Sequence, residues 1–201
     1  GVDSAASLVL GVKAIGANNV YVGIFPYGEL NNKGTEDAKL VIDNLNIPKN
    51  NIDLIDIKPM VDATVSVIPD LIGNPDSRVR ENDKSNLRRG NIIARMRMIL
   101  LYDLSKKYNA LVLGTENKTE YLLGYFTRFG DEASDLEPIF NLYKTQVKQL
   151  ASYLGIPEKI ISKSPTAGMW TGQTDEGEFG FSYEEADRIL HLWHDKKYKK
   201  E

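Results

Sequence analysis

Short apolar runs alternate with stretches of helical periodicity along this chain. Val20–Phe25, Ile52–Ile57 and Ala110–Thr115 are rich in apolar and β-branched residues, which predicts three strands. Apolar residues spaced three or four apart predict helices around them. These helices cover Ser4–Ile15, Thr35–Leu45 with Thr35 as its cap, Met60–Ile72, Ile92–Leu104, Thr119–Tyr125 and Thr145–Leu154, and a last helix follows a capping box of Ser182 and Glu185. The alternation predicts an α/β fold with a mostly parallel sheet.

The run Ala110–Thr115 has no polar residue before its end, which predicts a strand buried on both faces inside the sheet. In parallel sheets, ligands lie beyond the carboxyl ends of the strands. Residues 26–35, 58–59 and 116–119 follow the predicted strands, and the sequence GVDS precedes the first predicted helix. We therefore expect these segments to meet at one crevice.

Composition restricts the class of protein. The 201 residues are 42% hydrophobic and 26% charged, so we expect one domain over residues 1–195 and a charged tail over 196–201. A net charge of −3 gives no cationic field for nucleic acid. The absence of cysteine excludes a disulfide scaffold, a thiolate metal site and a cysteine nucleophile. No apolar run approaches the roughly 18 residues of a membrane helix, so we expect a cytoplasmic protein without a membrane partner.

Two carboxylates are candidates for a phosphate site. Gly1 leaves room at the predicted helix N-terminus, where Asp3 could hold Mg²⁺ and Ser4 could bond a phosphate oxygen. Glu120 lies one helical turn after the strand end at Thr115, and paired carboxylates at a phosphate site are typical of Mg²⁺ binding. Asp and Ser are also ordinary residues at helix N-termini, and these positions alone favour that structural role.

Other stretches are candidates for ligand contacts. Asn91 and Arg95 share one face of an apolar helix, where an arginine indicates an anionic ligand or a buried carboxylate; a solvated face is the alternative. Residues 124–135 and 164–180 are long loops with aromatic residues, a composition typical of binding loops. His191 and His194 have no carboxylate motif beside them, which favours surface or packing roles over metal binding.

The motifs, taken in order, resemble one family. GVDSA, GNIIARMRM, GTENKTEYLLGYFTRFGD, PIFNLYKTQV and SKSPTAGMWTGQTDEGEFGFSYEEAD are together similar to the ammonia-dependent NAD synthetases of the N-type ATP pyrophosphatase (PP-loop) group. The resemblance implies a three-layer, Rossmann-like α/β fold of the adenine nucleotide alpha hydrolase type. The family's phosphate loop reads Ser-Gly-Gly-x-Asp-Ser, and Gly1–Ser4 is similar to its second half. We therefore expect the natural chain to carry a further strand before Gly1.

The resemblance also implies an activity and a set of site residues. In this family, ATP adenylates the nicotinate of deamido-NAD⁺, and ammonia then displaces AMP to give NAD⁺. The implied roles are Mg²⁺ binding by Asp3 and Glu120; ATP binding by Gly1, Ser4, Thr115, Lys144 and Thr166; deamido-NAD⁺ binding by Asn91, Arg95, Arg128 and Asp135; and catalysis by Asp131 and Lys144, with Asp131 orienting ammonia or accepting its proton. A homodimer is also implied.

The chain departs from the family pattern in two places. Arg128 stands where many members have lysine, which keeps the charge and changes the geometry. A His-Lys pair that contacts substrate near the C-terminus of many members has no clear counterpart. No glutaminase segment is present, which implies free ammonia as the nitrogen source. The alternatives are another PP-loop adenylating enzyme, such as one similar to GMP synthetase or a tRNA-modifying enzyme, and a nucleotide-binding fragment without activity.

Overall fold

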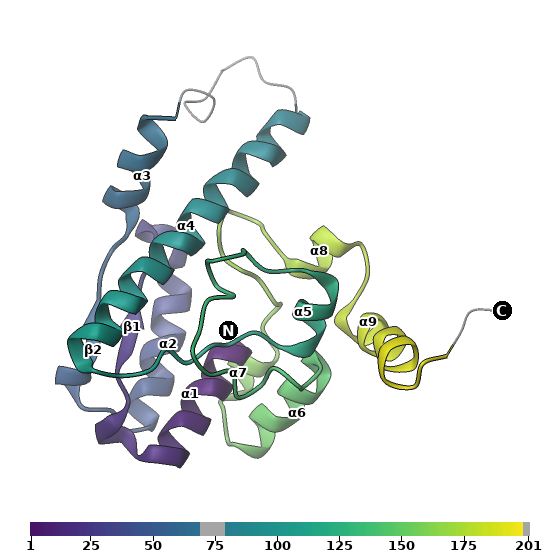
Figure 1. Ribbon diagram of the computed structural model, residues 1–201, viewed down its shortest axis with the longest axis horizontal. Coiled ribbons are helices and arrows are strands. Elements are labelled where there is room, and N and C mark those ends of the chain that lie inside the picture. The colour runs from purple at the N-terminus through teal and green to yellow at the C-terminus, as the bar shows by residue number, and fades with distance from the viewer. Residues whose placement is uncertain (69–78, 199–201) are drawn as a thin grey trace.

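The computed structural model describes residues 1–68 and 79–198, with the backbone alone for residues 79–84. Helices predominate and surround a small parallel sheet (Figure 1). The elements are α1 (Val2–Ile15), β1 (Val22–Ile24), α2 (Asn32–Asn44), β2 (Ile52–Leu54), α3 (Lys58–Ser66), α4 (Val79–Tyr108), α5 (Lys118–Leu123), α6 (Lys144–Tyr153), α7 (Glu158–Ile161), α8 (Asp175–Phe179) and α9 (Tyr183–Leu190). A π-helical turn, His191–Asp195, continues α9.

The two strands pair in parallel, as predicted. Val22 lies opposite Ile52 and Ile24 opposite Leu54, and α2 forms the crossover between the strands. Both strands are shorter than the apolar runs that predicted them. The pairing nevertheless continues beyond β2, because the backbone amides of Ile55 and Ile57 donate to the carbonyls of Ile24 and Pro26.

The prediction of a buried strand at Ala110–Thr115 is wrong. Leu113 forms only an isolated parallel bridge with Leu136, and the side chain of Leu111 is 74% exposed. The amide of Gly114 donates to the carbonyl of Leu136, and the amide of Val112 donates to the carboxylate of Asp135. The backbone of this run is therefore satisfied by residues 135–136 rather than by a neighbouring strand.

Several helix boundaries also differ from the prediction. Helix α2 begins at Asn32, because a 3₁₀ turn over Gly28–Asn31 leads directly into it, so Thr35 lies inside the helix and does not cap it. Helix α4 begins at Val79, upstream of the predicted start at Ile92, because the residues before Ile92 are polar and carry no apolar stripe that would reveal a helix. Helix α3 ends at Ser66, and the rest of the predicted Met60–Ile72 helix beyond residue 68 lies outside the described residues.

In the view of Figure 1 the start of the chain lies near the middle of the ribbon, in front of other elements. Helix α1 packs on α6 and α7 through a core that includes Ala6, Val147 and Ile160. A second core joins α3 to α4, with Val61 and Ile93 fully buried. The first of these cores places the first turn of α1 beside α6, and the hydrogen bond from Asn117 to Asp3 places it beside α5. Within residues 1–68 and 79–198, no helix has both the length and the apolar character needed to cross a membrane.

Candidate active site

The buried ammonium group of Lys144 joins two carboxylates. Its Nζ lies 2.6 Å from Oδ2 of Asp3 and 3.1 Å from Oε1 of Glu120, and its side chain is 3% exposed. Asp3 lies in the first turn of α1, Glu120 in the first turn of α5, and Lys144 is the first residue of α6. Three residues that the sequence separates widely therefore meet where the N-termini of these helices converge.

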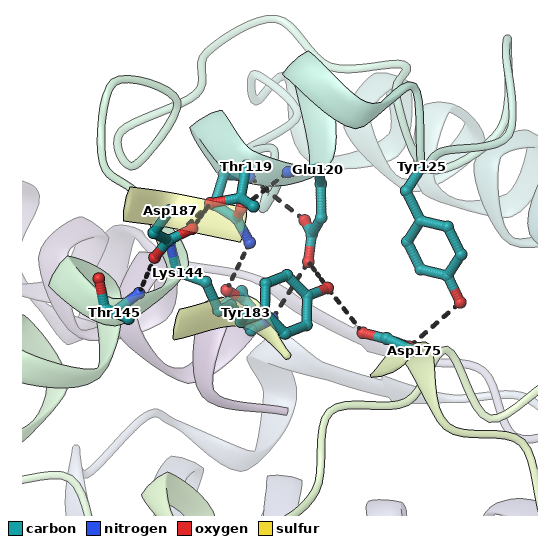
Figure 2. Close-up of polar contacts among 10 residues, drawn as sticks. Thr119, Glu120, Tyr125, Lys144, Thr145, Asp175, Tyr183 and Asp187 are labelled. Atoms are coloured by element: carbon teal, nitrogen blue, oxygen red, sulfur yellow. Dashed lines mark hydrogen bonds and ion pairs between the residues drawn. The ribbon is translucent and has the colours of Figure 1, made fainter. Parts of the chain in front are cut away.

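The remaining oxygens of the two carboxylates are also hydrogen-bonded. The Asn117 side-chain amide donates to Oδ1 of Asp3 at 3.1 Å, and the Asn117 backbone amide donates to Oε2 of Glu120 at 3.3 Å. Asn117 is fully buried and caps α5. The Tyr183 hydroxyl lies 3.4 Å from Oε1 of Glu120 and 2.9 Å from Oδ2 of Asp175 (Figure 2). Each carboxylate therefore has a fixed orientation.

The electrostatics of this group follow from its burial. Burial, followed by the charge of Asp3, raises the pKa of Glu120 to about 7. Burial alone would lower the pKa of Lys144, but the carboxylates of Asp3 and Glu120 outweigh it and raise that pKa well above its ordinary value. Lys144 is therefore a permanent cation.

The same carboxylates could hold a divalent metal. Mg²⁺ is commonly bound by one or two protein carboxylates together with phosphate oxygens. Asp3 and Glu120 converge on one cation, the ammonium of Lys144, so their oxygens already point toward a common position. The hard oxygen donors fit Mg²⁺ when a ligand supplies the remaining oxygens.

A second group brings together the predicted substrate-contact residues of α4 and the loop 124–135. Arg95 donates from Nη2 to the carbonyl of Arg128 at 3.1 Å, and Asn91 accepts a hydrogen bond from the Thr127 hydroxyl at 3.0 Å. Asp131 accepts from the amide of Thr127 at 2.9 Å. These contacts place Asn91, Arg95, Arg128 and Asp131 at one side of the molecule.

A family model matches the entire chain: the model of NAD synthase matches residues 1–201. The chain belongs to the NAD synthase family. It is 48% identical over 201 residues to an NH(3)-dependent NAD(+) synthetase from Thermococcus kodakarensis, a match that covers 100% of this chain and 72% of that protein. The family resemblance that the motifs predicted is thereby confirmed.

Solved structures support the fold of this NAD synthase family member. The NMN synthetase from Francisella tularensis is 34% identical with a TM-score of 0.81, and the match covers 98% of this chain and 82% of that one. The NH3-dependent NAD synthetase from Campylobacter jejuni, solved with a nitrate ion, is 32% identical with a TM-score of 0.74, and the match covers 98% and 72%. The predicted three-layer α/β class, with a parallel sheet between helices, is confirmed.

The other residues predicted to bind ATP in this NAD synthase chain do not join the Lys144 group in the described part of the structure. Gly1 and Ser4 are exposed at the start of α1. Thr166 accepts a hydrogen bond from the amide of Gly168 in its own loop. Within the part of the chain that the structure describes, Ser4, Thr115 and Thr166 make no hydrogen bond with Lys144, Asp3 or Glu120. Their roles at an ATP site stay predictions.

The predicted surface role of the two histidines fits the structure. His191 and His194 are exposed, and each contacts Asp195 through Nδ1, at 3.2 and 3.0 Å. Across the described residues, no cluster of three or more His, Cys, Asp or Glu side chains could hold a metal ion.

Sequence reasoning missed several buried polar residues around the site. Asn117 and Thr119 lie inside the GTENKTE motif, and Asp187 ends the SYEEAD stretch. All three are buried and hydrogen-bonded. The signal that could have found Asp187 is an acidic residue on the apolar face of its helix, between Ala186 and Leu190. Glu116 is also buried, and no sequence pattern singled it out.

Proposed function

We propose that this chain catalyses the ATP-dependent amidation of deamido-NAD⁺ with ammonia, which gives NAD⁺, AMP and pyrophosphate through an adenylated nicotinate. The observation that carries the proposal is the buried Lys144, Asp3 and Glu120 group at three helix N-termini in a chain of the NAD synthase family. The relatives named NH(3)-dependent NAD(+) synthetase favour this reaction over those of other PP-loop adenylating enzymes.

The chemistry explains why such a group is needed. A carboxylate is a poor electrophile, and attack of the nicotinate oxygen on the α-phosphorus of ATP converts it into a mixed anhydride with AMP as the leaving group. Pyrophosphate departs from that phosphorus with high negative charge. The Lys144 ammonium and the positive end of the α1 dipole oppose this charge from fixed positions. Asp3 and Glu120 would hold Mg²⁺, which supplies further charge neutralisation when bound.

The roles of the remaining site residues are proposed from their positions in the family motifs. Gly1, Ser4, Thr115 and Thr166 are proposed ATP contacts. Asn91, Arg95, Arg128 and Asp135 are proposed deamido-NAD⁺ contacts, supported by the hydrogen bonds that join α4 to the loop at Thr127 and Arg128. Asp131 is proposed to orient ammonia.

A second candidate substrate is nicotinate mononucleotide. The structural relative from Francisella tularensis is named an NMN synthetase and has a TM-score of 0.81. Both substrates present the same nicotinate carboxylate for adenylation, so the residues around Lys144 would serve either. The difference lies in the adenylate half of the dinucleotide, which only the larger substrate possesses.

The decisive experiment measures amide formation with each substrate. Purified protein is supplied with ATP, Mg²⁺ and ammonium, and with either deamido-NAD⁺ or nicotinate mononucleotide. NAD⁺ is detected with a coupled dehydrogenase and NMN by chromatography. We expect kcat/KM to be higher with deamido-NAD⁺. A higher value with the mononucleotide would favour the second candidate, and turnover of neither substrate would contradict the proposed reaction.

A homodimer is proposed as the assembled state. Large apolar side chains are exposed on α4 and after it, with Ile99 55% exposed, Leu111 74% and Leu136 56%. Apolar exposure of this kind marks interaction surfaces. Sedimentation velocity should give twice the chain mass of 22.5 kDa, and a sedimenting monomer at micromolar concentration would contradict the proposal.

A further inference from the structure

A part-buried amide side chain joins two segments that lie far apart in the sequence. Asn31 ends the 3₁₀ turn that follows β1, and its Nδ2 donates to the carbonyl of Gly168 at 2.9 Å. Gly168 belongs to the loop 164–174, which leads into α8. The Oδ1 of Asn31 accepts from the backbone amide of Tyr27 at 2.9 Å. One side chain therefore ties the turn after β1 to the loop 164–174.

Arg97 of α4 holds the Asn31 amide in this orientation. Its Nη2 donates to Oδ1 of Asn31 at 3.1 Å, and its Nε donates to the carbonyl of Phe25, just after β1, at 3.1 Å. Its Nη1 lies 3.8 Å from the sulfur of Met169 in the loop. None of these three partners is a carboxylate, although a buried guanidinium is costly without a counter-ion and burial lowers the pKa of Arg97. The planar fork of donors on one side chain thus reaches β1, the turn after it and the loop.

Gly168 carries this contact onward to Thr166, a proposed ATP contact. The carbonyl of Gly168 accepts from Asn31, while its amide donates to Oγ1 of Thr166 at 3.1 Å. Its φ of +63° lies in the left-handed region that favours glycine, and a Cβ at this position would lie 3.0 Å from Nδ2 of Asn31. The close approach of Asn31 to the loop therefore depends on glycine.

The other contacts of the loop are internal or apolar. The amide of Met169 donates to Oε1 of Gln173 at 2.7 Å, and the Met169 side chain packs beside the core that joins α3 to α4. Among the described residues, the hydrogen bonds that tie the middle of the loop to elements outside residues 164–180 come from Asn31 and Arg97. These two side chains therefore determine where the loop lies relative to β1.

We propose that Arg97 and Asn31 are positioning residues that hold the loop 164–174 in the place at which Thr166 meets ATP, an inference that rests on the proposed function. Neither side chain needs to touch the nucleotide. When a loop occupies its binding position only part of the time, the apparent affinity for the ligand falls by that fraction. The bound complex is the same once it forms, so this role predicts a change in KM for ATP and not in kcat.

Asn31→Asp tests the contact with the smallest change in the full chain. A carboxylate keeps both bonds that Oδ1 accepts, but it has no donor for the Gly168 carbonyl and repels it. We expect KM for ATP to rise roughly 10-fold, the size of one lost hydrogen bond, with kcat and KM for deamido-NAD⁺ unchanged. Asn32→Asp places the same charge on the exposed neighbouring residue and should alter none of these constants.

Two glycine variants test the same contact from the side of the loop. Gly168→Ala puts a methyl group against Asn31, whereas Gly172→Ala carries the same kind of backbone strain, at a φ of +81°, with nothing within 4 Å of its Cβ. We expect KM for ATP to rise in Gly168→Ala well above its value in Gly172→Ala. The double variant of Asn31→Asp and Gly168→Ala should be no worse than the more impaired single variant, because both remove one contact. Effects that multiply would overturn the proposal.

Arg97→Lys tests the part played by the guanidinium. It keeps the positive charge but replaces the fork with a single ammonium, which cannot reach Phe25 and Asn31 together in the same geometry. We expect KM for ATP to rise as it does in Asn31→Asp. An unchanged KM for ATP would contradict the role of Arg97 as a positioning residue.

Trp170 reports the position of the loop without any activity. Its ring lies against Gly90 of α4, since a Cβ added at Gly90 would lie 3.3 Å from it. Trp193 is 69% exposed, and in a Trp193→Phe background Trp170 is the one tryptophan of the chain. We expect Asn31→Asp to shift the emission of Trp170 to longer wavelength, and saturating ATP with Mg²⁺ to restore it.

The readouts separate this proposal from the proposed function. Unchanged emission in Asn31→Asp, an unchanged KM for ATP, or an equal rise in KM for ATP and for deamido-NAD⁺ would overturn the positioning role. Absence of NAD⁺ formation by the unchanged protein would instead contradict the proposed function, and the emission of Trp170 would still show whether Asn31 holds the loop.

Discussion

At the scale of single residues, two part-buried carboxylates share one buried cation, the ammonium of Lys144. Lys144→Met leaves Asp3 and Glu120 without their shared counter-ion, and removing one partner of a buried ion pair typically costs about 3–5 kcal/mol. The folded-state pKa of Glu120, about 7, lies above its ordinary value of 4.5. The folded protein therefore binds more protons than the unfolded chain between these values, and stability falls as pH rises through this window. At pH 5.5 the Glu120 carboxyl is largely protonated and needs no counter-ion, whereas at pH 8 it is ionised. We therefore expect the substitution Lys144→Met to lower the free energy of unfolding more at pH 8 than at pH 5.5, as measured by urea denaturation.

The control for this prediction lies one turn further along the same helix. Lys148 is part-buried on α6, and Lys148→Met should change the free energy of unfolding by no more than about 0.5 kcal/mol at either pH. If Lys148→Met matched Lys144→Met, the loss would come from the charge of α6 as a whole and not from the two carboxylates.

At this scale the motifs single out residues that the structure brings together. They predict roles for Asp3, Glu120 and Lys144, and the Lys144 ammonium lies within hydrogen-bond distance of both carboxylates. Glu116 was missed because its distinctive property is an environment and not a residue type. Burial and the absence of a donor arise only when residues 132–137 fold against it, and no spacing in the sequence encodes that.

At the scale of elements, side chains from α5 and α9 satisfy the start of α6. The Lys144 amide donates to the hydroxyl of Thr119 at 2.9 Å, and that hydroxyl donates to Oδ1 of Asp187 at 2.5 Å (Figure 2). The amide of Thr145 donates to Oδ2 of Asp187 at 2.8 Å. The first amides of a helix have no carbonyl acceptor within it. Thr119 and Asp187 therefore fix the position at which Lys144 leaves the backbone.

Thr119→Val tests this connection, because it removes the hydroxyl and keeps the branched shape. The Lys144 amide then loses its acceptor and Oδ1 of Asp187 its donor, at a cost of about 1–3 kcal/mol for the buried groups left unpaired. We expect a lower free energy of unfolding, from urea denaturation, together with a lower kcat. Thr119→Ser, which keeps the hydroxyl and loses one methyl, should cost about 0.8 kcal/mol. Equal losses in both variants would mean that the hydroxyl does not support α6.

Elements defined by local signals could be predicted, and those defined by distant partners could not. The capping box of Ser182 and Glu185 is present at the start of α9, because both partners lie within one turn. The Ala110–Thr115 run has strand composition, but its partner is the segment at Asp135 and Leu136 rather than β1. A strand needs a neighbour, and the identity of that neighbour is a property of the whole fold.

At the scale of the whole molecule, the proposed ATP site joins distant parts of the chain. The start of α1 lies beside α5 and α6, and α8 and α9 follow on one side of them (Figure 1). The hydroxyl of Tyr183 on α9 contacts both Asp175 of α8 and Glu120 of α5. A ligand at this place would contact residues from the beginning, middle and end of the chain, so its binding energy stabilises the fold as a unit.

ATP with Mg²⁺ should therefore stabilise the folded state as a whole. A ligand that binds only the folded protein at 100 times its Kd adds about 2.7 kcal/mol to the free energy of unfolding, which in a chain of this size raises Tm by about 5–10 °C. We expect the single cooperative unfolding transition to move to a higher temperature in differential scanning calorimetry.

ATP with a chelator should give a smaller shift, because Asp3 and Glu120 then lack the proposed metal. Lys144→Met should also reduce the shift, whereas Lys148→Met should not. An undiminished shift in Lys144→Met would place the ATP site elsewhere, since the proposed site cannot keep its affinity while the carboxylates of Asp3 and Glu120 face the phosphates without a counter-ion.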